Sequence, residues 1–283
     1  MAGFQRKDKK RAALEKEFAA LTKKEARLRQ SAAKAVPSHW KADLEEKIPE
    51  KVCQSLEAAF GKAFSVVFTQ GVSVIERTYS RRGLEEDHAV QDYAVMVKGG
   101  RREIKRLNRN VGRSDLANMA LTTAEGIGLG VLGIGLPDIV LFVGMLLKGV
   151  YETALSYGFS YDAPEERLLI LHMMEAALTN SPAFAEKDAQ VEKLLNGAFR
   201  PDEGELQAQI QETGRAFAVD MLLLKVVQGI PVVGVLGGMA NPVYYNKVMR
   251  YVRLKYQKRY LLTVAQRNGI SLQREKAADV NAN

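Results

Sequence analysis

Apolar side chains recur at helical spacing through almost the whole chain, and no window shows the sustained alternation that a strand requires. In residues 1–34, the apolar positions Leu14, Phe18, Leu21 and Leu28 lie three, four or seven residues apart, with charged residues between them. This spacing places them on one face of a helix. The pattern therefore predicts an amphipathic or coiled-coil-like N-terminal helix that ends before Pro37.

The apolar pattern resumes after residue 48 and predicts a long helix with a clear beginning. Ile48-Pro49 is expected to open this helix, because proline is tolerated in the first helical turn. The helix is expected to run to about Tyr79, where the sequence Arg-Arg-Gly of residues 81–83 favours a stop. Another helix is expected over residues 85–108.

Capping signals predict where the later helices begin. Ser114 is expected to N-cap a helix, and Asp162 is expected to cap the helix that contains Arg167–Leu178, because Pro164 and Glu165 follow it. Further helices are expected from Ser181-Pro182, over residues 203–228, and from Pro242 to about Arg267. The last of these has a stripe of apolar and tyrosine residues opposite many of its basic residues: Tyr245, Met249, Val252, Tyr256 and Tyr260.

Together these elements predict an all-α fold with a single multi-helix domain. The expected organisation is a basic amphipathic extension over residues 1–36, a helical domain over residues 37–270 and a flexible tail over residues 271–283. Two apolar helical segments within the domain are broken by glycine and proline, and they are the most distinctive part of the sequence.

These two segments, residues 127–147 and 226–246, are long enough for a membrane span of about 20 residues. Asp138 in the first would cost about 2.5–3.5 kcal/mol at the centre of a bilayer, and broken backbone at that depth needs protein around it. A Gly-x-x-x-Gly spacing, which lets helices approach closely, occurs with each segment. We expect the segments to pack together, in a helical core or in a membrane, through Gly126, Gly130, Gly133, Pro137, Pro231, Gly234, Gly238 and Asn241.

Charge is distributed unevenly along the 283 residues, whose formal net charge is +8. Residues 1–34 hold eleven Lys or Arg against four Asp or Glu, residues 98–113 hold seven against one, and residues 247–276 hold nine against one. Residues 162–220 hold twelve acidic and five basic residues. Basic stretches favour a phosphate-bearing partner, although solvated helix faces show similar runs. The candidate contacts with an anionic surface are Lys9, Lys10, Arg11, Arg101, Arg102, Lys105, Arg106, Lys247, Arg250 and Arg253.

Composition and motifs exclude several classes of site. A single cysteine, Cys53, excludes a disulfide framework, and the three histidines are isolated, so we expect no metal and no cofactor. The N-terminus has no apolar run of signal-peptide type, which makes the cytoplasm the expected compartment. Residues 128–133 match Gly-x-Gly-x-x-Gly, but the residues before them are expected to be helical, whereas a dinucleotide site needs a strand there.

Three polar residues in apolar surroundings are weak catalytic candidates: Asp138, Glu152 and His172. On one helix Asp138 and Glu152 would lie about 21 Å apart, which is too far for a carboxylate pair. We expect Asp138 to cap the helix that follows it and Glu152 to pair with Lys148 at i,i+4 spacing. His172 with Glu175 at i,i+3 spacing is expected to lie at the edge of the core.

Several blocks in order resemble the EcsC protein family, and together they cover about residues 45–265. The blocks are Ile48-Pro49-Glu50-Lys51-Val52, Gly135-Leu-Pro-Asp138, Tyr157-Gly158, Pro164-Glu-Glu-Arg167, Ile230-Pro-Val-Val-Gly234 and Gly238-Met-Ala-Asn241. The resemblance implies an all-helical bacterial protein, cytoplasmic and linked to membrane or transport processes. It implies no established catalytic residues, and residues 1–34 look like an addition outside the family block.

Charge, glycine-rich segments and resemblance lead to one principal expectation. The chain is expected to be a non-enzymatic, membrane-associated interaction protein, peripheral on the inner face of the membrane, whose partner is an anionic membrane surface or a component of a membrane transporter. One alternative is a hydrolase-like enzyme with a pocket at the broken helices around Asp138, Glu152 and His172. Another is nucleic-acid binding through the basic tail. The sequence leaves the oligomeric state open.

Overall fold

The computed structural model describes residues 2–34, 49–121, 137–180, 183–197, 199–227 and 242–272. Every regular element in these ranges is helical and none is a strand, which confirms the expected all-α fold. The elements are α1 (Ala2–Lys34), α3 (Glu50–Val66), the π-helix η1 (Val67–Gly71), α4 (Val72–Glu76), α5 (Arg81–Lys98), α6 (Arg101–Leu121), α7 (Pro137–Ser156), α8 (Pro164–Leu178), α9 (Phe184–Asn196), α10 (Glu203–Val227) and α11 (Pro242–Arg267).

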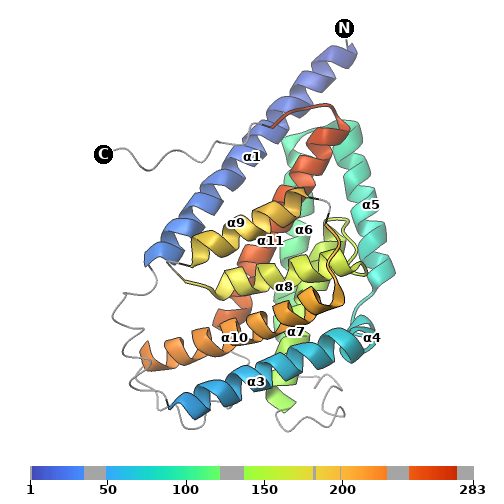
Figure 1. Ribbon diagram of the computed structural model, residues 1–283. Helices are drawn as coiled ribbons and strands as arrows, with labels where there is room; N and C mark the ends of the chain where they lie inside the picture. The colour runs from blue at the N-terminus through green and yellow to red at the C-terminus, as the bar shows by residue number, and fades with distance from the viewer. Residues whose placement is uncertain are drawn as a thin grey trace, which may run out of the picture.

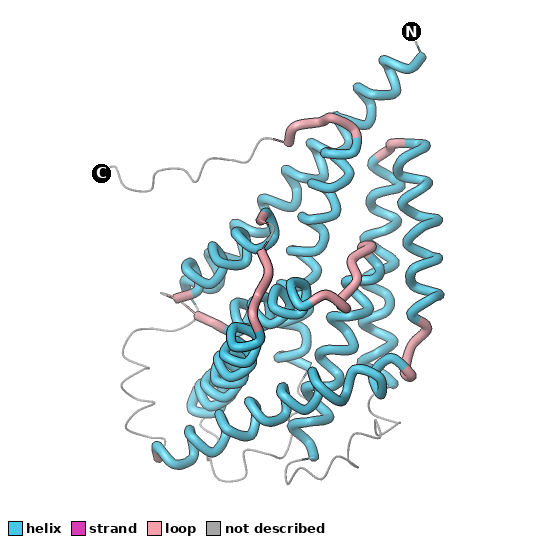
Figure 2. The backbone as a smooth tube through the Cα atoms, turned by 45° about the vertical axis from the view of Figure 1, so that its right-hand side comes forward, coloured by secondary structure: helices cyan, strands magenta, loops and turns pink. Residues whose placement is uncertain are grey.

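The helices pack around α7 and α11, which contact each other in the interior. Helices α3 and α10 lie side by side at one end of the molecule (Figure 1). Helices α5 and α6 form an antiparallel hairpin at another edge and both contact α7 (Figure 2). Helix α1 runs across the remaining side, where it contacts α6, α9 and α11. The turn of the α5–α6 hairpin therefore lies at the same end of the molecule as the N-terminus (Figure 1).

Helix α7 is the central core helix. Two helical segments of the described residues, Glu50–Glu76 and Ile139–Ser156, are long and apolar enough to cross a membrane by length and composition. In the second, 89% of the residues are buried inside the protein, so its apolar side chains are already covered by other helices. Such burial is typical of the core helix of a protein. Length and composition alone are weak evidence for a membrane span.

The described ends of the two glycine-rich segments meet in this core. Phe142 of α7 lies edge-on to Tyr244 of α11, with ring centroids 6.4 Å apart, and it also contacts Phe217 of α10. Pro137 is the first residue of α7. The remaining predicted packing residues lie outside the described residues: Gly126, Gly130, Gly133, Pro231, Gly234, Gly238 and Asn241.

Several predicted helices are present with nearly the expected bounds, namely α1, α10 and α11. The long helix expected from Pro49 ends at Glu76 and contains the single π turn η1. The aromatic stripe of α11 is buried, with Tyr245, Met249 and Tyr256 each no more than 1% exposed. Proline and regular apolar spacing were sufficient local signals for these elements.

Three predicted helix signals differ in the structure. The long helix ends at Glu76, close to the expected Tyr79, but residues 81–83 begin the next helix, α5, because the side chain of Ser80 accepts a hydrogen bond from the Gly83 backbone N–H at 3.1 Å and caps that helix. The helix expected over residues 85–108 is divided at Gly99, whose φ of 60° is left-handed and suits glycine. Ser114 is not a cap, because it lies inside α6.

Asp162 also does not cap a helix. The N-cap of α8 is Ala163, which makes no side-chain hydrogen bond to the helix. The Asp162 carboxylate instead forms an ion pair with Arg81 and accepts a hydrogen bond from Ser160. Asp162 therefore stabilises the contact between α5 and the loop before α8, not the start of α8.

Helix α1 is part of the packed core. Leu14 and Leu21 are at most 1% exposed and Phe18 is 9% exposed, so the apolar face predicted from the sequence is covered. Leu14 and Phe18 belong to the same hydrophobic cluster as α7 and α11. The expected N-terminal extension therefore packs as part of the domain, because α1 buries its apolar stripe against it.

Candidate functional site

Helix α6 has an apolar inner face and a basic outer face over residues 101–111. Its inner face is apolar, with Ile104, Leu107 and Val111 no more than 2% exposed. Its outer face carries five exposed basic residues, which we call the basic face: Arg101, Arg102, Lys105, Arg106 and Arg109. At 100° per residue they occupy an arc of about 140° on a stretch about 12 Å long.

Among residues 101–111, the part of α6 whose side chains the structure describes, negative charge is confined to the first turn. Glu103 is the one acid within residues 101–111, and it is only partly exposed. A Cβ placed on Gly100 would lie 2.4 Å from the Glu103 carboxylate, so this carboxylate lies back toward the start of the helix. Anionic side chains in the first turn are favourable because they offset the positive end of the helix dipole. The basic face is therefore left without an exposed acid on it.

Helix α1 adds further cations beside the basic face. Arg101 forms an ion pair with Glu17 of α1, which is 5% exposed, so the two helices are joined by a charged contact. Lys10 donates hydrogen bonds to the Met96 carbonyl at 2.8 Å and to the Asn268 side chain at 2.7 Å, and its stem covers Gly99. The N-terminal part of α1 therefore lies at the turn of the α5–α6 hairpin.

This position of α1 also places Lys9 and Arg11 near the hairpin turn. Both side chains are exposed, and Arg11 forms an i,i+4 ion pair with Glu15 at 2.9 Å. They lie on the exposed side of the helix that passes the hairpin turn, where Lys98 is exposed as well. Cations from α1, α5 and α6 thus gather at one end of the molecule.

Most basic residues of α11, unlike those on the basic face of α6, form ion pairs with acids of other helices. Lys247 lies 2.7 Å from Asp220 of α10, Arg259 lies 2.6 Å from Glu166 of α8, and Arg267 lies 3.0 Å from Asp92 of α5. Of the other two predicted surface contacts here, Arg250 is exposed and Arg253 is partly buried. The acidic residues 162–220 and the basic residues of α11 therefore neutralise each other across helix contacts.

Lys255 is the centre of this internal neutralisation. Its side chain is 1% exposed, and its ammonium lies 2.7 Å from Asp188, 2.5 Å from Glu192 and 3.2 Å from Glu25. Burial alone would lower the pKa of Lys255, but attraction by these carboxylates outweighs it, and the pKa is raised above its ordinary value. Lys255 is therefore a buried, fully charged cation held by α1 and α9.

The surrounding groups complete a buried charge network, which we define as Glu25, Arg29, Asp188, Glu192, Lys255 and Lys258. Arg29 lies 2.8 Å from Asp188, and Lys258 lies 2.9 Å from both Glu25 and Glu192. Burial would raise the pKa of Asp188 and of Glu192, but Lys255 outweighs it and lowers both. Because each member has an opposite charge beside it, the network supports a structural role.

The two predicted acid–base candidates with described side chains are paired. Lys148 and Glu152 lie 3.3 Å apart at i,i+4 spacing, both buried in α7. His172 Nδ1 lies 3.7 Å from Glu175, which also binds Lys187 at 2.6 Å. Burial would raise the pKa of Glu175, but hydrogen bonds from His172 and Lys187 lower it.

Asp138 is the third candidate, and its position is consistent with the start of a helix rather than its interior. It is the second residue of α7, so it is not the N-cap that the sequence predicts; a carboxylate in the first turn offsets the positive end of the helix dipole. Glu152 lies near the opposite end of the same helix, and His172 lies on α8. The three candidates are therefore distributed over separate positions of the fold.

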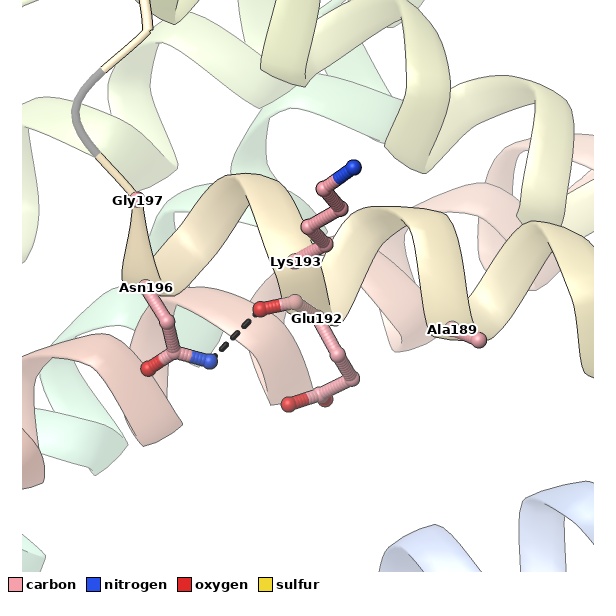
Figure 3. A pocket seen from close by; sticks show the side chains of 5 residues that line it. All are labelled: Ala189, Glu192, Lys193, Asn196 and Gly197. Carbon is pink, nitrogen blue, oxygen red and sulfur yellow. Dashed lines mark hydrogen bonds between the residues drawn. The ribbon is translucent and has the colours of Figure 1, made fainter.

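Two cavities lie on the described surface away from the predicted catalytic residues Asp138, Glu152 and His172. The first, of about 570 Å³, is a wide, open depression along α9 lined by Ala189, Glu192, Lys193, Asn196 and Gly197. Figure 3 shows that the Asn196 amide points back to the Glu192 backbone carbonyl, 2.6 Å away. The second, of about 240 Å³, lies between α5, α6 and α7 and includes His88, Gln91 and Asn110.

Nucleophile and metal chemistry also find no support in the described residues. The Cys53 thiol is half-buried and donates to Glu57 at 3.5 Å; burial, followed by the negative charge of Glu57, raises its pKa and disfavours the reactive thiolate. Across the part of the chain that the structure describes, no three His, Cys, Asp or Glu side chains are grouped as metal ligands.

One polar cluster was missed by sequence reasoning. Arg81 binds Asp162 and Glu76, and its guanidinium lies 5.0 Å from the ring centre of Tyr161. The Tyr161 hydroxyl donates to Glu76 at 2.7 Å and lies 2.5 Å from the hydroxyl of Tyr79. Burial raises the pKa of Tyr79 to about 12, and Arg81 lowers the pKa of Asp162 to about 2. No local signal links residues 81 and 162 in the sequence.

The fold and the charged surface define a class of protein: an all-α domain whose interior charges are paired and whose α1 and α6 present cations to solvent. The model of the EcsC protein family matches residues 12–261, so the chain belongs to that family. No curated protein and no solved structure matches it. The family match includes most of α1, so the expectation that residues 1–34 stand outside the family block is wrong for residues 12–34.

Proposed function

We propose that this protein is a non-enzymatic peripheral membrane protein of the cytoplasm that binds the anionic inner face of the membrane. The contact is the basic face of α6 together with the neighbouring cations of α1. The observation that carries the proposal is the arc of five exposed cations, Arg101 to Arg109, opposite a buried apolar face. A membrane transporter seated in the same bilayer is the partner that such binding would bring within reach.

The magnitude of the attraction supports this proposal. A basic side chain close to an anionic leaflet contributes about 1 kcal/mol. Arg101 is already paired with Glu17, so the other four residues of the arc contribute up to about 4 kcal/mol, or about three powers of ten in affinity. The pairing of α11 with residues 162–220 adds to the argument, because it leaves α1 and α6 as the strongest source of uncompensated positive charge among the described helices.

The membrane is favoured over nucleic acid by the composition of the surface. Single-strand binders place aromatic platforms among their cations, and the described side chains of α6 include no aromatic residue. Tyr251, Tyr256 and Tyr260, which lie among the basic residues of α11, are no more than 2% exposed. The enzyme alternative gains nothing from the positions of Glu152 and His172, which lie in separate buried pairs.

The proposal is tested by sedimentation of the full chain with vesicles. We expect the protein to pellet with phosphatidylcholine vesicles that contain phosphatidylglycerol, to remain soluble with pure phosphatidylcholine, and to be released by salt. Failure to pellet with anionic vesicles at low salt would overturn the proposal. Tighter binding to single-stranded RNA or duplex DNA than to anionic vesicles in the same buffer would overturn it in favour of nucleic acid.

A further inference from the structure

Helix α5, the other arm of the hairpin, exposes large apolar side chains. Val90 and Tyr93 are each 70% exposed, and with Val243 they are the exposed large apolar side chains of the described residues. At i,i+3 spacing Val90 and Tyr93 lie on one face of α5, and Ala89 beside them is also exposed. Single exposed apolar residues are ordinary on a protein surface, so their position beside other groups decides what they can do.

The hairpin places these side chains level with cations of the basic face. Tyr93 lies six residues before Gly99, and Arg106 lies six residues after Gly100. Val90 and Arg109 lie nine residues from the same two glycines. Because α5 and α6 are antiparallel and rise equally per residue, each pair lies at the same height along the hairpin. The hairpin therefore combines exposed apolar side chains on α5 with exposed cations on α6 at the same heights.

Three of the four acids of α5, Glu85, Glu86 and Asp87, lie in the half of the helix far from the turn, and the exposed Asp87 is one turn before Val90. Glu85 and Glu86 are in the first turns of α5, far from Gly99, and form i,i+4 ion pairs with Arg81 at 3.1 Å and Arg82 at 2.7 Å. Beyond Asp92, which binds Tyr260 and Arg267 of α11, α5 contains no acid before the turn. The half of the hairpin near its turn thus carries Tyr93, exposed cations and no exposed acid on its described side chains.

We propose that the α5–α6 hairpin docks with its outer surface against the bilayer and that Tyr93 and Val90 insert among the headgroups while the basic face binds lipid phosphates. This inference rests on the proposed function and adds the orientation and the inserting residues. A tyrosine suits the interface because its ring is apolar and its hydroxyl remains hydrated. Charge complementarity decides the occupant, because the cations level with the apolar strip select an anionic bilayer surface over an apolar protein partner.

The insertion is tested with an environment-sensitive fluorophore on the full-length chain. Cys53→Ser removes the native thiol, Tyr93→Cys carries a nitrobenzoxadiazole label, and Lys62→Cys on exposed α3 carries the same label as the control. With phosphatidylglycerol vesicles we expect the label at residue 93 to shift to shorter wavelength and to be protected from an aqueous quencher. We expect the label at residue 62 to show neither change.

Unlabelled variants give a second measurement. Val90→Ala with Tyr93→Ala is expected to weaken binding to anionic vesicles about tenfold, whereas Val243→Ala, at the other exposed apolar site, leaves binding unchanged. If sedimentation persists but residue 93 shows no shift and the double variant binds normally, the orientation is wrong and the proposed function stands. If the wild-type chain does not sediment with anionic vesicles, both proposals are overturned.

Discussion

Lys255 and Asp188 form a buried ion pair, with 2.7 Å between the ammonium and the carboxylate and with the lysine side chain 1% exposed. The pair joins the basic C-terminal helix α11 to α9, which belongs to the acidic middle of the chain. Charges that look segregated along the sequence are therefore brought together in the fold. Much of the positive charge of α11 is neutralised there, and the cations of α6 and α1 remain on the surface.

Loss of the Lys255 cation is expected to destabilise the protein strongly. In Lys255→Met the carboxylates of Asp188, Glu192 and Glu25 lose their central partner inside the protein. Removal of one side of a buried charge network costs about 3–5 kcal/mol, and we expect the free energy of unfolding in urea to fall by that amount. Arg250→Met, at an exposed position of the same helix, is the control. A loss for Lys255→Met as small as that of the control would contradict a fully charged network.

The same network predicts how stability depends on pH. The pKa of Asp188 and Glu192 is lowered in the folded protein, so their contribution is complete above the ordinary values of 3.8 and 4.5 and is lost as the pH falls through the folded values. The pKa of Lys255 is raised, so its contribution is complete below 10.5 and is lost as the pH rises through the folded value. Tyr251, Arg29, Glu25 and Lys258 face the same groups.

We therefore expect the contribution of this network to be level between about pH 5 and pH 10 and to decline on both sides. Urea unfolding measured at a series of pH values checks this. In Asp188→Asn the acid limb is expected to be shallower than in the wild type, because one carboxylate with a lowered pKa has been removed. An acid limb with the wild-type slope would mean that Asp188 titrates alike in the folded and unfolded chain.

The integration of α1 into the core gives a third prediction. Leu21→Ala removes a side chain that is 1% exposed, and large-to-small substitutions at such positions cost about 2–5 kcal/mol. Lys16→Ala, at an exposed position of α1, serves as the control and is expected to change stability by less than about 0.5 kcal/mol. If Leu21→Ala unfolds at the same urea concentration as the wild type, packing of α1 against the domain does not contribute to stability.

Two glycines at the contact of α3 and α10 give a matched pair of substitutions. A Cβ on Gly214 would lie 2.7 Å from the backbone nitrogen of Gly61, and backbone cannot move aside easily. A Cβ on Gly61 would meet the end of the Gln211 side chain, which is flexible. We expect Gly214→Ala to cost about 1–3 kcal/mol and Gly61→Ala to cost less, as measured by thermal or urea unfolding. The reverse order would mean that the two helices are not in close backbone contact.

Local signals were sufficient for much of the fold. Periodic apolar residues and prolines predicted α1, α10 and α11, because these features act within one or two turns of a helix. Signals that involve distant residues were misread. Asp162 has the sequence of a helix cap but binds Arg81, which is 81 residues away, and only the tertiary fold decides between the two partners.

The candidate site was predictable only in part. The amphipathic spacing of residues 101–111 is visible in the sequence, and so is its basic character. The pairing of Lys247 and Lys255 with acids of α10 and α9 could not be predicted from the sequence. A run of charged residues does not reveal which side chains meet across two helices. Close helix contact was expected at the Gly-x-x-x-Gly glycines. In the described residues, two helices approach closely at Gly61 and Gly214, and neither of these has another glycine four residues away.

The most direct test of the account compares two charge variants for binding to phosphatidylglycerol vesicles. One replaces four residues of the basic face (Arg102, Lys105, Arg106 and Arg109) by glutamine, and Arg101 is kept because it binds Glu17. The control replaces four exposed cations elsewhere by glutamine, namely Lys62, Arg77, Lys193 and Arg200, so that both variants lose the same net charge.

We measure the vesicle concentration at which half of each variant is bound, at low salt. The basic-face variant is expected to bind about 100-fold more weakly than the wild type, and the control is expected to bind nearly as well as the wild type. Wild-type binding by the basic-face variant, or an equal loss in both variants, would contradict the claim that α6 is the membrane contact.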